Sequence, residues 1–389
     1  MRGCGLVALT GGGLINVDAG KSCFNFFATS RILVRILCCI VTISVHAPVT
    51  AKPFDKQRRG VLAGGNWIVD HVKMIDVWPA QDTLANISTQ SDGNGGGPYN
   101  VTKNLAKLGC GFPLAGVGLI GHDADGEKIV QDCRAHAIDH AALQKCATAP
   151  TSYTDVMTVA GTGRRTFFHQ HGANALLDLP HFDPGSTQAR IFYLGYLCLL
   201  QTLDSVDAIG RTKASVLLEK AGALGTITVA DLVSNETVDF PAIVNPSLPH
   251  LDYLFLNEFE LARLVGGEAS KSPSQLESQA REVLRRGVRG AVIVHLPQGG
   301  LCVAKDAPAI LQPSVRVPAN LIVGTAGAGD AFSAGVIMGL HEGWDFKRCL
   351  ELGVCAAAAS LRDATCSAAI EPWQDCLALG RNLGFHPRM

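Results

Sequence analysis

The stretch "VGTAGAGDAFSAG", residues 323–335, surrounds a single acid, Asp330, with glycines and alanines. A periodic apolar segment follows, so Gly327, Ala328 and Gly329 are expected at the N-terminus of a helix, where unpaired amide N–H groups bind anions. Asp330 would then lie beside a transferred phosphoryl group and accept the proton of an attacking hydroxyl. The same spacing suits a tight strand-to-helix turn with a capping acid, so this stretch alone leaves both interpretations open.

The chain upstream of this stretch predicts an α/β fold. Apolar runs typical of strands buried on both faces of a parallel sheet occur at residues 60–65, 113–121, 190–197, 226–233, 252–257 and 291–296. Helical patterns occur at residues 100–108, 125–136, 203–221, 273–286 and 331–341. This alternation indicates helices on both sides of the sheet and a ligand site beyond the carboxyl ends of its strands.

One segment, residues 153–170, departs from the alternation. It contains two β-rich runs around "AGTGRR", which predicts a hairpin with a glycine-containing loop. The polar stretch at residues 83–94 is expected to be its neighbour in a small sheet that covers the site.

Composition favours a small-molecule partner in the cytoplasm. The 389 residues are 47% hydrophobic, which is enough for a large core, and the formal net charge is -1. Without a basic excess, neither nucleic acid nor an anionic membrane surface is an expected partner. The thirteen cysteines show no metal-ligand spacing and fit the reduced thiols of an intracellular protein.

Residues 1–58 lack this organisation and are expected to be a disordered extension or the product of a start codon assigned too far upstream. Their apolar part, residues 32–45, is shorter than the roughly 20 residues of a spanning helix. It also begins late for a signal peptide, although export or anchoring remains the alternative. In "GGGLINVDAGKS" Ile15 stands where a P-loop needs glycine, so Lys21 and Ser22 are interpreted as a chance match.

Three further stretches precede "GAGD" in a fixed order. They are "GGNWIVD" at residues 64–70, "GNGGGPYN" at 93–100 and "LNEFE" at 256–260. Singly they suit surface acids, a flexible loop and ordinary acids in the first turn of a helix. Jointly they resemble the ribokinase-like, or PfkB-type, carbohydrate kinase family over about residues 60–375. The resemblance implies a three-layer α/β/α domain at residues 59–385, with a mainly parallel central sheet and a small β lid formed by residues of about 72–94 and 152–172.

The resemblance also implies a role for individual residues. Asp330 corresponds to the catalytic base, and the backbone of Gly327, Ala328 and Gly329 corresponds to an anion hole. The residues that it assigns to the substrate are Asn66, Asp70, Gly96, Gly97, Asn100 and Asn174. Those assigned to ATP and Mg²⁺ are Asn257, Glu260, His295 and Gly300, with Glu260 acting on the metal through water. For His169 and His171, a substrate contact and an ordinary exposed or core histidine both remain open.

Two positions depart from the family pattern. Gly324 stands where the family usually has an acid associated with cation binding, so dependence on a monovalent cation is in doubt. His295, Leu296 and Pro297 replace a T-x-G turn beside the nucleotide, and the proline removes a backbone N–H, so nucleotide preference is left open.

The expected function is therefore Mg²⁺- and ATP-dependent transfer of the γ-phosphoryl group to a hydroxyl of a sugar or nucleoside. The alternative is a catalytically weak sugar- or nucleotide-binding regulator that keeps the fold. A Rossmann-type dehydrogenase is disfavoured because no G-x-G-x-x-G follows the first strand. The sequence does not define the acceptor, and a homodimer is left open.

Overall fold

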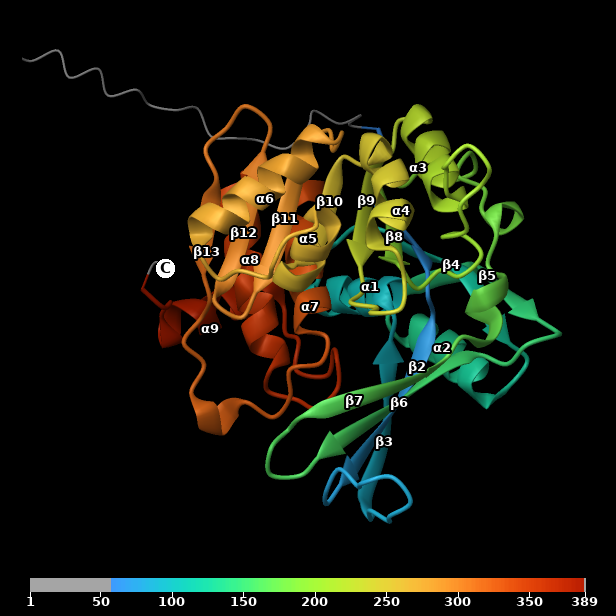
Figure 1. Cartoon of the computed structure of the whole chain (residues 1–389), viewed down its shortest axis with the longest axis vertical. Coiled ribbons are helices and arrows are strands. Elements are labelled where there is room, and N and C mark those ends of the chain that lie inside the picture. Colours follow the sequence, from blue (N-terminus) through green and yellow to red (C-terminus); the bar gives the residue numbers. More distant parts are fainter. Residues whose placement is uncertain (1–56, 388–389) are drawn as a thin grey trace, which may run out of the picture. The chain divides into compact units, whose positions relative to one another are not determined.

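The computed structural model of the protein describes residues 57–387. Within this range a nine-stranded sheet has the order β13-β12-β11-β10-β9-β8-β1-β4-β5 (Figure 1). Its strands are β1 (Val61–Gly65), β4 (Leu114–Gly121), β5 (Ile138–Cys146), β8 (Ile191–Leu197), β9 (Ile227–Leu232), β10 (Tyr253–Asn257), β11 (Ala291–Leu296), β12 (Gly299–Ala304) and β13 (Ile310–Pro313). Neighbouring strands from β5 to β11 pair in parallel, whereas β12 and β13 pair antiparallel at one edge. The expected mainly parallel sheet is confirmed.

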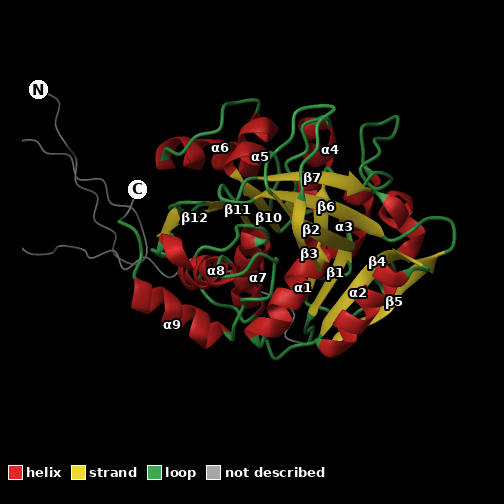
Figure 2. Ribbon diagram, turned by 90° about the horizontal axis from the view of Figure 1, so that it is seen from below, coloured by secondary structure: helices red, strands yellow, loops and turns green. Residues whose placement is uncertain are grey.

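Helices cover both faces of this sheet (Figure 2). The apolar clusters on one face include residues of α1 (Gly97–Leu108), α2 (Ala124–Ala135), α7 (Ala328–His341), α8 (Phe346–Ser360) and α9 (Trp373–Leu383). Those on the other face include residues of α3 (Lys213–Ala223), α4 (Phe240–Val244), α5 (Glu258–Val265) and α6 (Pro273–Arg285). Short 3₁₀ helices are η1 (Gly172–Leu176), η2 (Leu179–His181), η3 (Asn245–His250) and η4 (Ala319–Leu321).

Strand β10 illustrates why the central strands are continuous apolar runs. Tyr253 and Phe255 belong to one cluster, and Leu254 and Leu256 belong to the other. Because successive side chains point to opposite faces and both faces are covered, every position must be apolar. The expected three-layer α/β/α arrangement is confirmed.

A second sheet, of four strands, has the order β3-β2-β6-β7. Its strands are β2 (Ile68–Ile75), β3 (Ile87–Gly95), β6 (Ser152–Val159) and β7 (Arg165–Gln170). The expected hairpin at residues 153–170 is confirmed as the antiparallel pair β6–β7. The polar stretch that forms β3 is not its neighbour, however, because β2 lies between β3 and β6 and pairs in parallel with β6. We refer to this four-stranded sheet as the lid.

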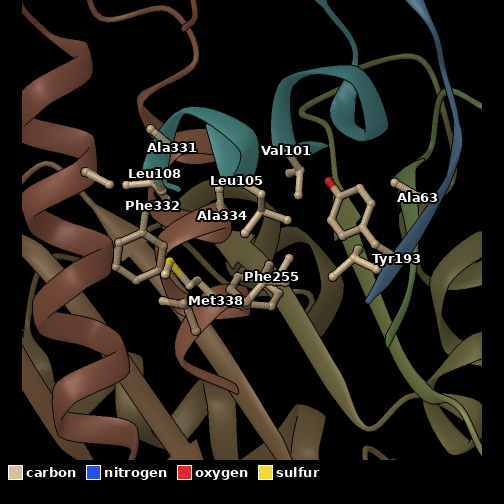
Figure 3. Packing of buried hydrophobic residues seen from close by; sticks show 14 of the residues in the cluster. Ala63, Val101, Leu105, Leu108, Tyr193, Phe255, Ala331, Phe332, Ala334 and Met338 are labelled. Carbon is tan, nitrogen blue, oxygen red and sulfur yellow. The ribbon is translucent and has the colours of Figure 1, made fainter. Parts of the chain in front are cut away.

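Helices α1 and α7 pack side by side over the central sheet (Figure 3). Leu105 of α1 and Ala334 of α7 belong to the same fully buried cluster. On its other side α7 approaches α8 closely, since a Cβ atom on Gly335 would lie 2.9 Å from the Cα of Gly353. This packing fixes the first turn of α7 against the first turn of α1.

One expected helix begins later than its pattern suggested. Residues 203–221 were expected to be helical, but α3 begins at Lys213. Asp207 Oδ1 instead accepts hydrogen bonds from the backbone N–H groups of Ile209 at 3.0 Å and Arg211 at 2.8 Å. Such side-chain bonds to the backbone compete with helix formation. Thr212 then caps α3 by accepting a hydrogen bond from the Ser215 N–H.

Three further features of the sequence are the N-terminal segment, membrane-spanning helices and the cysteines. The apolar segment and the "GGGLINVDAGKS" match fall on residues that lie outside the described range. Within residues 57–387, no helix has the length and apolar character that crossing a membrane requires. The cysteines at the described positions are free thiols.

Candidate active site

A cleft of about 890 Å³ lies between the lid and the carboxyl ends of the central strands. Tyr196, Asp231 and Asn257 reach it from the ends of β8, β9 and β10. Asp70 reaches it from lid strand β2, and Asp330 from the first turn of α7. Ligands of open α/β sheets bind at this edge, as the sequence pattern predicts.

The first turn of α7 has the geometry of an anion site. Gly327 precedes the helix with φ +70°, and no side chain caps the helix. The Ala328 N–H makes only a long turn bond, 3.4 Å to the Thr325 carbonyl oxygen, so the start of the helix can still donate to a ligand, and the dipole favours an anion there. A Cβ atom on Gly327 would lie 2.5 Å from the Cβ of Cys366, and one on Gly329 would lie 2.9 Å from the Cε1 of His295. Both positions need glycine because Cys366 and His295 leave no room for a Cβ atom there.

Two side chains hold the carboxylate of Asp330. Asn100 Nδ2 donates a hydrogen bond to Oδ2 at 2.8 Å, and the Tyr196 hydroxyl donates one to Oδ1 at 2.5 Å. Asn100 is oriented in turn, because its Oδ1 accepts a hydrogen bond from Asn94 Nδ2 at 2.6 Å. Asn94 also donates to the hydroxyl of Ser367 at 2.9 Å. The acid is thus fixed by a chain of hydrogen bonds rather than only by its place on the helix.

The surroundings of Asp330 tune its proton affinity. Burial raises the pKa of its carboxyl group to about 6, and the hydrogen bonds from Tyr196 and Asn100 oppose that rise. The group is therefore ionised at pH 7 and is still a better proton acceptor than an exposed aspartate. A general base works best when its pKa lies near the operating pH.

Three other buried acids of the cleft hold their protons more tightly than Asp330 does. Burial raises the pKa of Asp70 to about 8, and the charge of Asp330 adds to that rise. Burial and the charge of Asp330 also raise the pKa of Asp231 well above its usual value, and its Oδ2 accepts a hydrogen bond from Ser333 at 2.9 Å. Burial raises the pKa of Glu260 to about 7. Asp330 is consequently the acid of this group that ionises first.

Asn257 and Glu260 form a capping box at the start of α5. Asn257 Oδ1 accepts hydrogen bonds from the N–H groups of Phe259 and Glu260, both at 2.9 Å. The Glu260 carboxylate accepts one from the Asn257 N–H at 2.8 Å and one from Ser234 Oγ at 2.9 Å. Both residues line the cleft as well, so the same side chains that stabilise the helix terminus present oxygen atoms to a ligand.

A second cavity, of about 530 Å³, adjoins the anion turn on the side away from the lid. It shares Asn257, His295 and Gly329 with the cleft. Its walls are largely apolar, from Pro297, Val315, Val317, Ile322, Phe332, Val354 and Leu361. Burial lowers the pKa of His295 to about 4, so its imidazole is neutral at pH 7.

Two asparagines assigned to the substrate turn away from the cleft. Asn66 Oδ1 accepts a hydrogen bond from the Tyr196 N–H at 2.8 Å, and its Nδ2 donates to the Leu199 carbonyl at 3.4 Å. Asn174 Nδ2 donates to the Trp67 carbonyl at 3.1 Å. Neither side chain lines the cleft. In this structure both residues hold backbone segments that surround the site.

Two glycines assigned to ligands lie in close packing contacts in this structure. A Cβ atom on Gly97 would lie 2.6 Å from the hydroxyl oxygen of Tyr193, so this glycine lets α1 approach β8. A Cβ atom on Gly300 would lie 2.6 Å from the Cε2 of Phe332, so it makes room for that ring beneath α7. Neither glycine lines the cleft or the adjoining cavity.

The other expected site residues do line the cleft. They are Asp70, Gly96, Asn100, Asn257, Glu260, His295, Gly327, Ala328, Gly329 and Asp330. His169 and His171 of the lid line it too, and burial lowers the pKa of His169 to about 4. Among residues 57–387, no group of three or more histidine, cysteine, aspartate or glutamate side chains is arranged to hold a metal by itself.

Tyr196, Asp231 and Arg165 are among the cleft residues that were not predicted from the sequence. Tyr196 lies inside an apolar run and shows no polar signal of its own. Asp231 ends an expected buried strand, a position at which the carboxyl-end rule already points to ligand contact. Arg165 follows the loop of the expected hairpin, where a charged residue is ordinary.

Comparison with known proteins identifies the relatives of this chain. A family model described as pfkB family carbohydrate kinase matches residues 65–373. A ribokinase of Arabidopsis thaliana is 28% identical over 268 residues, which is 67% of this chain and 65% of that protein. An ATP-dependent ribose-1-phosphate kinase of Halopiger xanaduensis is 28% identical over 320 residues, which is 82% of this chain and 96% of the relative.

A solved structure extends this likeness to the fold. The structure of Arabidopsis thaliana ribokinase complexed with ribose and ATP aligns with a TM-score of 0.68 at 22% identity, covering 85% of this chain and 100% of that one. The expected ribokinase-like fold is confirmed.

Proposed function

Because the chain belongs to the pfkB family of carbohydrate kinases, we propose that it transfers the γ-phosphoryl group of ATP to a hydroxyl group of a sugar or a related small molecule. The observation that carries the proposal is Asp330, held by Asn100 and Tyr196 at the uncapped start of α7. A proton acceptor and an anion site therefore lie within one turn of a helix, which is the pair of features that phosphoryl transfer to a hydroxyl needs.

The acceptor hydroxyl lies against Asp330 in this mechanism. Each carboxylate oxygen has two lone pairs, so the hydrogen bonds from Asn100 and Tyr196 leave positions for the hydroxyl proton. The hydroxyl oxygen attacks the γ-phosphorus, its proton passes to Asp330, and the bond from the γ-phosphorus to the bridging oxygen breaks as ADP leaves. The amide groups of Ala328 and Gly329 face the phosphoryl oxygens during transfer.

The cavity beside His295 suits the base of the nucleotide. Its apolar walls fit a flat heteroaromatic ring, and it opens on the anion turn, where the phosphates would lie. The aligned ribokinase structure, which is a complex with ribose and ATP, supports the proposal of a nucleotide site in this fold. The lid lies over the other end of the cleft, where closure would exclude water from the reacting phosphoryl group.

A magnesium ion fits the donor set of the cleft. Hard divalent cations prefer oxygen ligands and keep several waters. The Glu260 carboxylate supplies such oxygens but already accepts two hydrogen bonds, from Asn257 and Ser234, so it would hold the ion through water. When bound, the ion supplies neutralisation of the phosphate charge.

The test is the Asp330→Asn variant, compared with the wild type for phosphoryl transfer from Mg-ATP to a panel of sugars, sugar derivatives and nucleosides. We expect turnover to fall by about 10²- to 10⁴-fold, because the base is lost. Thermal stabilisation by Mg-ATP should persist, because asparagine keeps the shape of the site.

The matched control is Asp204→Asn. Asp204 is also a buried aspartate, but it accepts a hydrogen bond from the Leu200 N–H at 2.8 Å and does not line the cleft. Its turnover should stay near that of the wild type. Unchanged turnover in Asp330→Asn contradicts the assignment of the base. Ligand-induced stabilisation of the wild type without transfer to any acceptor favours a binding regulator.

A further inference from the structure

Arg165, the first residue of lid strand β7, brings a positive charge into the cleft. Phe167 and His169 lie at alternate positions of the same strand and also line the cleft, as the two-residue period of a strand requires. The Arg165 side chain is half-buried. Among the described residues its guanidinium takes part in no hydrogen bond or ion pair within normal distance limits.

Gly324 creates the space in which this guanidinium lies. A Cβ atom on Gly324 would be 2.9 Å from Nη2 of Arg165 and 2.8 Å from the Asp363 carbonyl oxygen. An acidic side chain at this position would contact Arg165 directly. With glycine at this position, no carboxylate of residues 57–387 forms an ion pair with Arg165.

The groups nearest to Arg165 do not neutralise it. Asp70 and the Cys366 thiol are the acidic groups whose charges act on it. Burial raises the pKa of Asp70 to about 8, and burial raises the pKa of Cys366 well above its usual value, so both are largely protonated at pH 7. Cys366 Sγ lies 3.9 Å from Asp70 Oδ2, which puts all three groups at the lid side of the cleft. Of these three groups, Arg165 is therefore the one that is charged at pH 7.

A partly buried guanidinium without a partner is unfavourable, and its planar set of donors matches a carboxylate or a phosphate in two parallel hydrogen bonds. We propose that the phosphoryl acceptor carries an anionic group, a carboxylate or a phosphate ester, and that Arg165 binds it. The inference rests on the proposed function, because it takes the lid side of the cleft as the acceptor site. Gly324 is then a specificity determinant, because it keeps Arg165 free for the substrate.

The test compares acceptors that differ in charge. Phosphoryl transfer from Mg-ATP is measured with aldonic acids, sugar phosphates and neutral sugars, led by D-gluconate, D-ribose 5-phosphate and D-ribose. The wild type should use one anionic class with a kcat/KM at least about tenfold above that of the neutral sugars, as expected for a hydrogen-bonded ion pair. Preference for aldonic acids identifies a carboxylate, and preference for sugar phosphates identifies a phosphate ester.

Two variants tie that preference to the two residues. Arg165→Met should lower kcat/KM for the anionic acceptor by about 10- to 100-fold and leave neutral acceptors within about twofold. Gly324→Asp should produce a similar selective loss, because the new carboxylate pairs with Arg165. Gly324→Ala introduces the same crowding without the charge and should retain the preference. Arg285→Met, which removes an exposed arginine of α6 that pairs with Glu282, is the control for general charge effects.

The outcomes separate this inference from the proposed function. Transfer to neutral sugars alone, or an equal loss for all acceptors in Arg165→Met, overturns the anionic acceptor but leaves the kinase intact. If no acceptor is phosphorylated, calorimetric titration with D-gluconate and D-ribose 5-phosphate still decides the matter. Binding to the wild type that disappears in Arg165→Met supports the anion site, and equal binding or no binding contradicts it.

Discussion

Replacing Tyr196 by phenylalanine should shift the acid limb of the kinase pH profile to higher pH. The change removes the hydroxyl that donates to Asp330 Oδ1 at 2.5 Å and leaves the ring in place. A hydrogen bond to a charged group contributes about 1.5–3 kcal/mol, and one pKa unit corresponds to about 1.4 kcal/mol, so the pKa of Asp330 should rise by about 1 to 2 units. The folded protein starts from a pKa of about 6.

The sign and size of the effect follow from the ionised fraction of Asp330. With a rise of about 1.5 units, that fraction at pH 7 falls from about nine-tenths to about one quarter, and kcat/KM falls about fourfold. At pH 6 the expected loss is about fifteenfold, whereas at pH 9 the two proteins should be nearly equal. The assay is kcat/KM for the best acceptor between pH 5 and pH 9.5, with Mg-ATP saturating.

Tyr99→Phe is the matched control for this experiment. Its hydroxyl donates to another aspartate, Asp132, at 2.6 Å, and Tyr99 does not line the cleft. This variant should keep the wild-type acid limb even if it is less stable. A Tyr196→Phe profile that is lowered equally at every pH, with no displacement of its acid limb, refutes the view that the tyrosine tunes the base.

Two further variants test the electrostatics and the packing. The folded-state pKa of Asp70, at about 8, lies above that of the unfolded chain, so stability should be lost as pH rises from about 4 to about 8. Asp70→Asn removes that loss, so in scanning calorimetry the variant should unfold about 5 °C above the wild type at pH 8.5 and at nearly the same temperature at pH 4. A difference in unfolding temperature that is the same at both pH values argues against this role of Asp70. Gly300→Ala places a methyl group against Phe332 and should cost about 1–3 kcal/mol in urea unfolding, with KM for ATP unchanged. A raised KM at unchanged stability would restore the nucleotide role that the sequence suggested.

The layers of the fold were predictable because buried parallel strands need apolar residues at every position. The runs at residues 252–257 and 291–296 correspond to β10 and β11 with little change of boundary. Lid strand β2 was missed because it follows β1 almost directly and its buried and half-buried positions do not alternate strictly. The start of α3 was wrong because a single aspartate, Asp207, organised a turn inside a helical pattern.

The position of a site residue could be predicted from the sequence where a single helix or strand determines it. The position of Asp330 follows from the start of α7, which the glycines before it predict. Asn66 does not line the cleft, and the residue after it, Trp67, packs its indole against Gly116 and Gly118 of β4, where Cβ atoms would come within 2.3 Å and 2.5 Å of the ring. Such a fit depends on residues about fifty positions away. The contact between Tyr196 and Asp330 joins residues 134 positions apart.

The hydrogen-bond chain that supports Asp330 also bears on the order in which the site forms during synthesis and folding. Its members, Ser367, Asn94, Asn100 and Asp330, come from distant parts of the sequence, and the bond from Asn94 to Ser367 joins residues 273 positions apart. During synthesis the lid strand and α1 emerge long before the segment that follows α8. The hydrogen-bond chain is therefore complete only when that late segment has docked beside the lid, so the last support of Asp330 is added after the strands and helices that hold it directly have been made.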